Sequence, residues 1–394
     1  MICGIYLLFW NEGNSITQHK ALAEGLRVAV DLMEDTQEIN GDLNGKLIHF
    51  SGTATTDSQV YDTTFGVGDQ SGDNFLKIRR SVEMYQWVEH ERSETTKNTG
   101  GSTDTEYTYT YTKEWKGSVV NSAYFKGDAY GHENPEIMQF QTRDFVAENI
   151  EVGAFLLSSE IVDMMNWWKP FPKTLSMDSI LDESTSSSAT LYGDVFYFGS
   201  GNPSYPSVGD TRVGFDVVPS QVISVVAKQT GSGLSAYTSK SGGSVLLVEA
   251  GYHDEAEMFK HANQSLTTQT WIIRFVGWLI MYIAFRGIMR PLSVCADALP
   301  FVGSLLEVGN SIVSLGLATG TTTIVIAIAW VVYRPLFSAI LMLILALGSW
   351  LAAKQVRGKN QQNHQHPYET PEAQFVVEIP DVGALPNSKF MDDP

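Results

Sequence analysis

Cysteine is almost absent from this chain, which has 394 residues and only two cysteines, Cys3 and Cys295. Neither lies between residues 13 and 268, so that region cannot form an internal disulfide and must be stable through its own core. The familiar catalytic motifs are also missing. The sequence has no phosphate-binding glycine-rich loop, no Gly-x-Ser-x-Gly elbow and no His-Glu-x-x-His zinc motif. These absences argue against the enzyme classes that such motifs define.

Positive charge is scarce in the first two thirds of the chain. Residues 1–270 hold 18 Lys and Arg against 36 Asp and Glu, whereas residues 271–394 hold eight of each kind. The whole net charge of −18 therefore belongs to the first region. Because acidic surface repels phosphate backbones, the composition excludes nucleic acid as an expected partner.

Uncharged apolar runs are concentrated near the C-terminus. They predict three transmembrane helices within residues 269–353, at 271–288, 311–332 and 336–353. At about 1.5 Å per residue, the run 311–332 covers roughly 33 Å, which is enough to cross a bilayer. Tyr333, Arg334 and Pro335 separate the last two runs, which should form a tight helical hairpin. The lipid bilayer is thus the first expected partner.

The apolar stretch 2–10 is too short to span a bilayer. It lacks the basic start and small-residue cleavage site of a signal peptide. We expect residues 1–12 to be the distal half of a first span that begins upstream. Trp10 would then be an interfacial aromatic, and the chain would leave the bilayer at Asn11, Glu12 and Gly13.

Basic residues predict the orientation of the spans. Arg286 and Arg290 follow the first C-terminal span, and Lys354, Arg357 and Lys359 follow the last. Both clusters are expected on the cytoplasmic side. Residues 13–268 would then face the ER lumen, the perinuclear space or a bacterial periplasm. The stretch 291–310 fits either an interfacial amphipathic helix or a loop at the headgroups.

Residues 13–268 have the pattern of a β-rich domain with helices at both ends. Apolar spacing predicts a helix at 15–33, and residues 253–269 should form a helix that leads into the first C-terminal span. Period-two alternation and β-forming residues predict strands at 46–50, 75–89, 106–115, 190–198, 212–218, 222–228 and 244–249. The fold class is therefore α+β, with this domain inserted between an N-terminal transmembrane helix and a C-terminal bundle of three. Residues 354–394 should be a disordered cytoplasmic tail.

Three polar segments are expected to be loops. Residues 90–105 should form a long hairpin loop, and residues 182–188 a surface loop. Residues 201–213 should be a fixed turn that enters a strand, with a ligand loop as the less favoured alternative. Asp210 and Arg212 should lie on one strand face and be able to pair.

No residue combination identifies a catalytic, cofactor-binding or metal site. His132-Glu133 lacks a second histidine, and His253 and His261 are far apart for one metal if both lie on one helix. His364 and His366 have ligand spacing but lie in the polar tail. The sequence therefore predicts a protein that is not an enzyme and has no cofactor.

Several stretches resemble the LUMA family of membrane proteins of the ER and inner nuclear membrane, which has bacterial relatives. They are residues 9–13 (FWNEG), 21–25 (ALAEG), 82–89 (VEMYQWVE), 109–115 (YTYTKEW), 202–213 (NPSYPSVGDTRV), 238–242 (TSKSG) and 330–336 (WVVYRPL). The resemblance implies four spans, a large lumenal domain between the first two, and self-association. It also implies a role in organising membrane protein complexes, with lamin- and emerin-type partners at an animal nuclear envelope. The family supplies no catalytic residues.

The leading hypothesis is a non-enzymatic multi-pass scaffold that self-associates and organises other membrane proteins, in the ER and inner nuclear membrane of a eukaryote or the plasma or inner membrane of a bacterium. A channel or transporter, and a membrane-linked enzyme without a recognised site, are the alternatives. Arg274 and Arg286 lie near span ends and are expected to snorkel to the interface. Gly316 and Gly320 should share one helix face and allow close helix packing, between chains or against 336–353.

Overall fold

The computed structural model describes residues 1–32, 38–69, 72–98, 103–128, 130–296 and 302–334, with short pieces at 339–340, 343–344, 346–350 and 354. The chain divides into two units, Met1–Tyr333 and Arg334–Pro394, and the description that follows concerns the first. The predicted span 336–353 falls largely outside the described residues, as does almost all of the tail 354–394.

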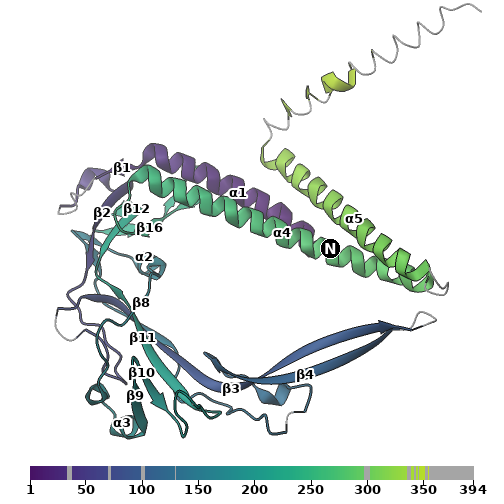
Figure 1. Cartoon of the computed structure of the whole chain (residues 1–394). Helices are drawn as coiled ribbons and strands as arrows, with labels where there is room; N and C mark the ends of the chain where they lie inside the picture. Colours follow the sequence, from purple (N-terminus) through teal and green to yellow (C-terminus); the bar gives the residue numbers. More distant parts are fainter. Residues whose placement is uncertain are drawn as a thin grey trace, which may run out of the picture. The chain divides into compact units, whose positions relative to one another are not determined.

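Three long helices form the apolar part of the first unit. They are α1 (Ile2–Val28), α4 (Glu255–Ala296) and α5 (Val302–Tyr333). Helices α1 and α4 lie side by side and antiparallel (Figure 1), and α5 packs against both. Two described helices are long and apolar enough to cross a membrane, Glu255–Met289 and Gly309–Tyr333. They contain the predicted spans 271–288 and 311–332.

Helix α1 corrects the predicted start of the chain. The stretch 2–10 and the predicted helix 15–33 are one continuous helix that ends at Val28. Asn11, Glu12 and Gly13 lie in its middle and are buried, so the helix does not end there. The polar side chains remain in the helix because each has a partner on a neighbouring helix. The segment 291–310 is likewise helical where it is described, as the last residues of α4 and the first of α5.

The β-rich part contains sixteen described strands. In chain order these are β1 (Val30–Asp31), β2 (Leu47–Thr55), β3 (Phe75–Lys97), β4 (Thr103–Lys116), β5 (Arg143–Val146), β6 (Glu151–Val152), β7 (Phe155–Leu156), β8 (Lys169–Pro170), β9 (Ala189–Tyr192), β10 (Val195–Phe198), β11 (Thr211–Pro219), β12 (Val222–Thr230), β13 (Gly233–Ser235), β14 (Tyr237–Thr238), β15 (Ser244–Val245) and β16 (Leu247–Ala250). Short helices α2 (Ser159–Met164) and α3 (Glu183–Ser188) complete it, with single turns at Gly41–Leu43, Ser122–Tyr124 and Met177–Ser179.

These strands form two main sheets. The first has the order β1-β2-β6-β7-β13-β12-β16, and an additional β2–β12 pairing closes five of its strands into a ring. The second has the order β4-β3-β11-β10-β9, with β5 beside β3 and β8 beside β11. Strands β14 and β15 pair separately. A single large core joins the two main sheets, and stacked phenylalanines lie in it, among them Phe65 against Phe196 with ring centroids 5.5 Å apart.

Most predicted strands are confirmed, and two predicted loops are wrong. Strand β3 continues to Lys97 and β4 begins at Thr103, so most of 90–105 is paired strand rather than loop. Backbone pairing of β3 with β4 extends to Lys97 and Thr103, and the threonines in both strands favour extended structure. Residues 183–188 form α3, because the Asp182 carboxylate accepts the Thr185 amide hydrogen and caps the helix. The predicted strand 190–198 is a hairpin, β9 and β10, which turns at Gly193 with φ 59°.

Candidate functional site

An ion pair is buried where the three long helices meet. Glu12 on α1 is 1% exposed, and its two carboxylate oxygens accept hydrogen bonds from Nε and Nη2 of Arg274 on α4, at 2.6 and 2.8 Å. The indole Nε1 of Trp330 on α5 donates to the same carboxylate at 2.8 Å. The Arg274 guanidinium, which is expected to snorkel from near a span end, is held by Glu12 in a bidentate pair.

Further hydrogen bonds continue from this pair along α1 and α4. The Asn11 side-chain amide donates to the Thr270 carbonyl at 3.2 Å, and the Thr270 hydroxyl donates to Ser15 Oγ at 3.0 Å. Arg274 also lies over the Trp271 ring, 4.7 Å from its centroid. Ionisable groups among apolar helices are costly unless they are paired, so this cluster fixes one register of the helices.

Close backbone approach accompanies the polar cluster. A Cβ atom at Gly277 would lie 2.6 Å from the Leu8 side chain, and one at Gly13 would lie 2.5 Å from the Tyr333 ring. These glycines let α4 and α5 contact α1 directly. Leu8, Met281, Ala318 and Val325 form the buried apolar part of the same contact.

The outer surfaces of the helices carry large apolar side chains. Among the described residues, exposed apolar side chains on α4 and α5 include Trp271, Ile272, Phe275, Ile283, Ile288, Ile312, Ile324, Ile328 and Val332. Water would disfavour so large an apolar surface, whereas lipid accommodates it. Arg286 is exposed towards the far end of α4 and stays compatible with an interfacial position.

Helix α5 presents two different stripes of small residues. Ser314, Ala318, Thr322 and Ala329 are buried on the face that packs within the chain. Gly316 and Gly320 lie on the outer face, where a Cβ at either position would have no atom within 4 Å. The predicted glycine face is therefore separate from the packing between α5 and the other described helices.

Asp210 closes the loop between β10 and β11 and does not pair with Arg212. Its carboxylate accepts hydrogen bonds from the Tyr197 hydroxyl and from the amides of Ser200, Gly201 and Ser207. Burial and the Asp210 carboxylate raise the pKa of Tyr197. Arg212 instead pairs with Glu83 on β3, with Nη2 2.6 Å from the carboxylate. The predicted Asp210–Arg212 pair is thus wrong because the loop turns Asp210 inward, and the loop has a structural role.

Lys77 is a buried amine that has a structural role. Burial lowers its pKa, while Asp144 and Asp163 oppose that effect. Its Nζ donates to the carbonyl oxygens of Val162 and Met165, at 3.0 and 3.2 Å. Those carbonyls lie at the C-terminal end of α2, where a cation is favourable. Lys77 therefore caps a helix rather than acting as a nucleophile.

His132 belongs to the base of the β3–β4 hairpin. Its ring stacks on Tyr111 with centroids 3.9 Å apart, and Nδ1 lies 3.0 Å from the Asp128 carbonyl. The next residue, Glu133, borders a shallow hollow of about 480 Å³ beside the turn Ser122–Tyr124.

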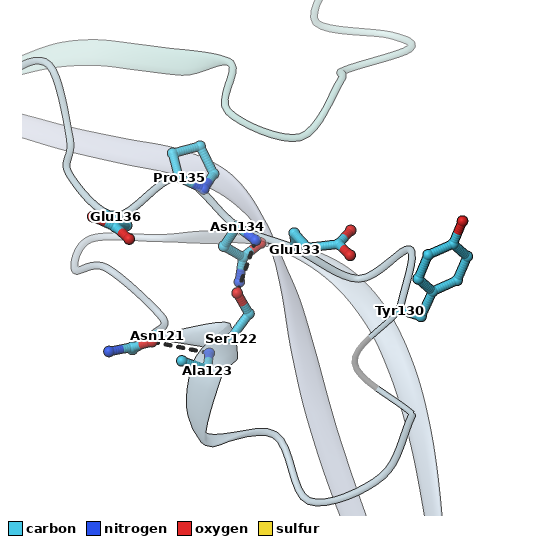
Figure 2. Close-up of a pocket in the computed structure, with 8 residues that line it drawn as sticks. All are labelled: Asn121, Ser122, Ala123, Tyr130, Glu133, Asn134, Pro135 and Glu136. Carbon is cyan, nitrogen blue, oxygen red and sulfur yellow. Dashed lines mark hydrogen bonds between the residues drawn. The ribbon is translucent and has the colours of Figure 1, made fainter.

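Figure 2 shows the Ser122 hydroxyl turned towards Asn134, whereas the Glu133 side chain points away from them. Asn134 donates to the carbonyls of Trp87 and Val120 and accepts the Trp87 amide hydrogen, and Ser122 Oγ accepts the Asn134 amide hydrogen. Tyr130 points away from them, and its side chain is largely exposed. The hollow is thus a turn closed by Asn134, and Glu133, one of the two carboxylates that line it, accepts the Gly131 backbone amide hydrogen.

The fold and the helical bundle define an integral membrane protein: a β-rich domain carried on helices long and apolar enough to cross a bilayer. A family model described as transmembrane protein 43 matches residues 84–335. Transmembrane protein 43 of Rattus norvegicus is 33% identical over 351 residues, 86% of this chain and 84% of the relative. The Homo sapiens protein is 33% identical over 364 residues, 90% of this chain and 87% of the relative. The homologue of Drosophila melanogaster is 28% identical over 347 residues, 85% of this chain and 87% of the relative.

The chain therefore belongs to the transmembrane protein 43 family, which confirms the resemblance described above under the name LUMA. No solved structure matches it. Sequence reasoning found the family but missed the Glu12–Arg274 pair, because these residues are 262 positions apart and no local pattern links them. An arginine inside an apolar run was the one available signal.

Proposed function

We propose that this protein is a non-enzymatic membrane scaffold, which self-associates and holds other membrane proteins in a fixed relation to the bilayer. One observation carries the proposal: α1 and α4 run without a break from the apolar bundle into the β-rich domain. A domain joined to a bundle by two continuous, mutually packed helices has little freedom to swing. Rigidity of this kind suits a protein that positions partners.

The contact between the helices and the first sheet supports this proposal. Ala21 and Leu22 of α1, Met258 and Phe259 of α4, and Leu47 of β2 share one buried apolar cluster. Polar contacts flank it: the Tyr237 hydroxyl donates to Glu24 at 3.0 Å and Ser241 donates to the Thr17 carbonyl at 3.0 Å. The domain is therefore packed onto the helices and is not merely linked to them.

The bundle favours a scaffold over a channel or transporter. Glu12 and Arg274 neutralise each other, and Trp330 takes a further acceptor position of the carboxylate. A closed arrangement of this kind holds helices together, whereas transport pathways usually keep ionisable groups in contact with water or substrate.

The sidedness and location of the domain belong to the same proposal. With Arg286 and Arg290 on the cytoplasmic side, the β-rich domain faces the ER lumen and perinuclear space, as the family resemblance implies. Lamin- and emerin-type partners would then be reached from the other side of the membrane. Protease added to sealed microsomes should leave the β-rich domain intact. Its digestion without detergent would reject this orientation.

Self-association is proposed to use the outer face of α5, where no atom of the described residues lies within 4 Å of a Cβ placed at Gly316 or Gly320. Two copies could bring their backbones close along such a face, gaining packing and Cα–H contacts in lipid. Replacing both glycines with leucine keeps the helix apolar but blocks the approach. We expect the double variant to lose most of the crosslinked dimer that wild type yields in mild detergent.

Gly287→Leu is the matched control, since Gly287 is an exposed glycine on α4 with no atom within 4 Å of its Cβ position. It adds one leucine elsewhere on the bundle, against two in the test variant, and should leave the dimer yield unchanged. An unchanged yield in the Gly316/Gly320 variant would remove this face as the interface. If the wild-type protein remained monomeric at every concentration tested, in nanodiscs and in detergent, self-association itself would be rejected.

A further inference from the structure

Two histidines and two glutamates meet where β16 turns into α4. Glu249 lies on β16, His253 in the turn, and Glu257 and His261 in the first turns of α4. One ligand atom each from Glu249, His253 and His261 lies within 4.8 Å of the others. The expectation that the two histidines are far apart is wrong, because α4 begins at Glu255 and the turn before it folds His253 back towards His261.

We propose that Glu249, His253 and His261 bind one divalent transition-metal ion of the zinc type. Zinc takes imidazole nitrogen and carboxylate oxygen at about 2.0–2.2 Å in tetrahedral geometry, which puts neighbouring ligand atoms about 3.3 Å apart. Here His261 Nδ1 lies 2.9 Å and His253 Nε2 3.8 Å from Glu249 Oε2. These two separations bracket the required value, and metal binding would turn His253 Nε2 from the Ala250 carbonyl oxygen, now 3.2 Å away, towards the ion. Three protein ligands leave the fourth position to water.

Glu257 gives the cluster the surroundings that metal-binding histidines need. One of its carboxylate oxygens lies 3.0 Å from His253 Nδ1, and the other lies 3.8 Å from His261 Nε2. These are the ring nitrogens that do not face Glu249. A carboxylate that accepts the proton of the outer nitrogen fixes the tautomer and leaves the inner lone pair for the metal. Glu257 therefore orients the His253 imidazole by a hydrogen bond and lies within ion-pair distance of His261.

Charge balance also favours a dication over bare ion pairs. The side chains of Glu249 and His253 are each 26% exposed, and those of His261 and Glu257 are 41% and 46% exposed. Ion pairs as exposed as these contribute little to the stability of the fold. Two protonated imidazoles with ring centroids 5.7 Å apart would repel each other. A single dication with neutral histidines instead balances the two carboxylates.

The position of the site gives it a structural consequence. His49 on β2 lies with Nε2 3.1 Å from the His253 carbonyl oxygen, and its Nδ1 contacts Asp31. A bound ion would crosslink β16 to α4 at the point where the β-rich domain joins the long helix. This site is distinct from the scaffold interface on α5, and its test does not depend on that interface.

The experiment is a zinc titration of the full chain in detergent after chelator treatment and removal of the chelator. Because His364 and His366 could bind zinc separately, both are first replaced with alanine. Calorimetry should show one zinc ion bound per chain, and cobalt substitution should give the visible absorption of a low-symmetry nitrogen–oxygen site. His253→Ala and His261→Ala should each abolish this saturable binding. Glu257→Gln should weaken it about 10- to 100-fold.

His132→Ala is the control, because His132 is a histidine of the same domain that stacks on Tyr111 away from the cluster. It should bind zinc as the parent chain does. Glu249→Gln, which keeps shape and volume, tests the ligand role without threatening the fold, and circular dichroism checks each variant. Absence of saturable binding in the parent chain would overturn the proposal. Binding that survives His253→Ala and His261→Ala would also overturn it.

Discussion

Replacing Arg274 with leucine should destabilise the helical bundle by about 3–5 kcal/mol, because Glu12 would remain as a buried, uncompensated charge. Glu12 is 1% exposed, and Trp330 is its other hydrogen-bond donor described here. The loss should appear as a lower midpoint when the protein in detergent micelles is unfolded by increasing denaturing detergent. Fluorescence of the bundle tryptophans Trp278 and Trp330 reports that transition.

Two further variants separate a broken pair from a general loss of packing. Glu12→Gln combined with Arg274→Met removes both charges and should recover most of the lost stability, since neutral residues of similar size often replace a buried pair at little cost. Arg286→Leu removes an exposed arginine of the same helix and should change stability little. If Arg274→Leu alone were as stable as wild type, Glu12 would not be buried against Arg274.

The second large effect concerns the contact between the helices and the first sheet. Phe259→Ala should cost about 3–5 kcal/mol, the usual result of removing a fully buried aromatic side chain. Phe259 is 1% exposed, and its ring lies 2.8 Å from the position a Cβ would take at Gly25, so the two helices touch through it. The cavity would open between α1, α4 and β2 and loosen the domain from the bundle.

Phe275→Ala is the matched control, because Phe275 lies on α4 at 60% exposure and faces outward. Its truncation in nanodiscs should cost far less than that of Phe259. Equal losses in the two variants would mean that Phe259 does not occupy a packed contact between the helices and the sheet.

Local patterns predicted most elements of this fold. Runs of β-forming residues located the strands that became β2, β11 and β12, and such runs can be recognised without a distant partner. Only β11 buries alternate residues, whereas β2 and β12 each bury five residues in a row. Apolar length likewise located the cores of α4 and α5. The helix predicted at 253–269 is confirmed as the first part of α4, whereas the continuation of α4 to Ala296 was not decided by the sequence, because residues 291–310 fitted either a helix or a loop.

Long-range contacts explain what the sequence could not predict. Asn11-Glu12-Gly13 is typical of a span end, but in the structure Thr270, Arg274 and Tyr333 supply partners that keep the helix intact. The cluster at Glu249, His253 and His261 depended on where α4 begins, a boundary set by how the preceding turn folds. The hydrogen bonds that Asp210 accepts from the loop amides could not be predicted either, because they depend on how the loop folds in three dimensions.

The β-rich domain and the membrane bundle should form one rigid body through α1 and α4. Pulsed electron–electron spin resonance in nanodiscs tests it, with labels at Asp42→Cys in the domain and Ile283→Cys on the outer face of α4, after Cys3 and Cys295 are replaced with serine. Both labelled positions are exposed. A single narrow distance distribution, which broadens in Phe259→Ala, is the result expected. A broad or multiple distribution in the otherwise wild-type chain would contradict the claim.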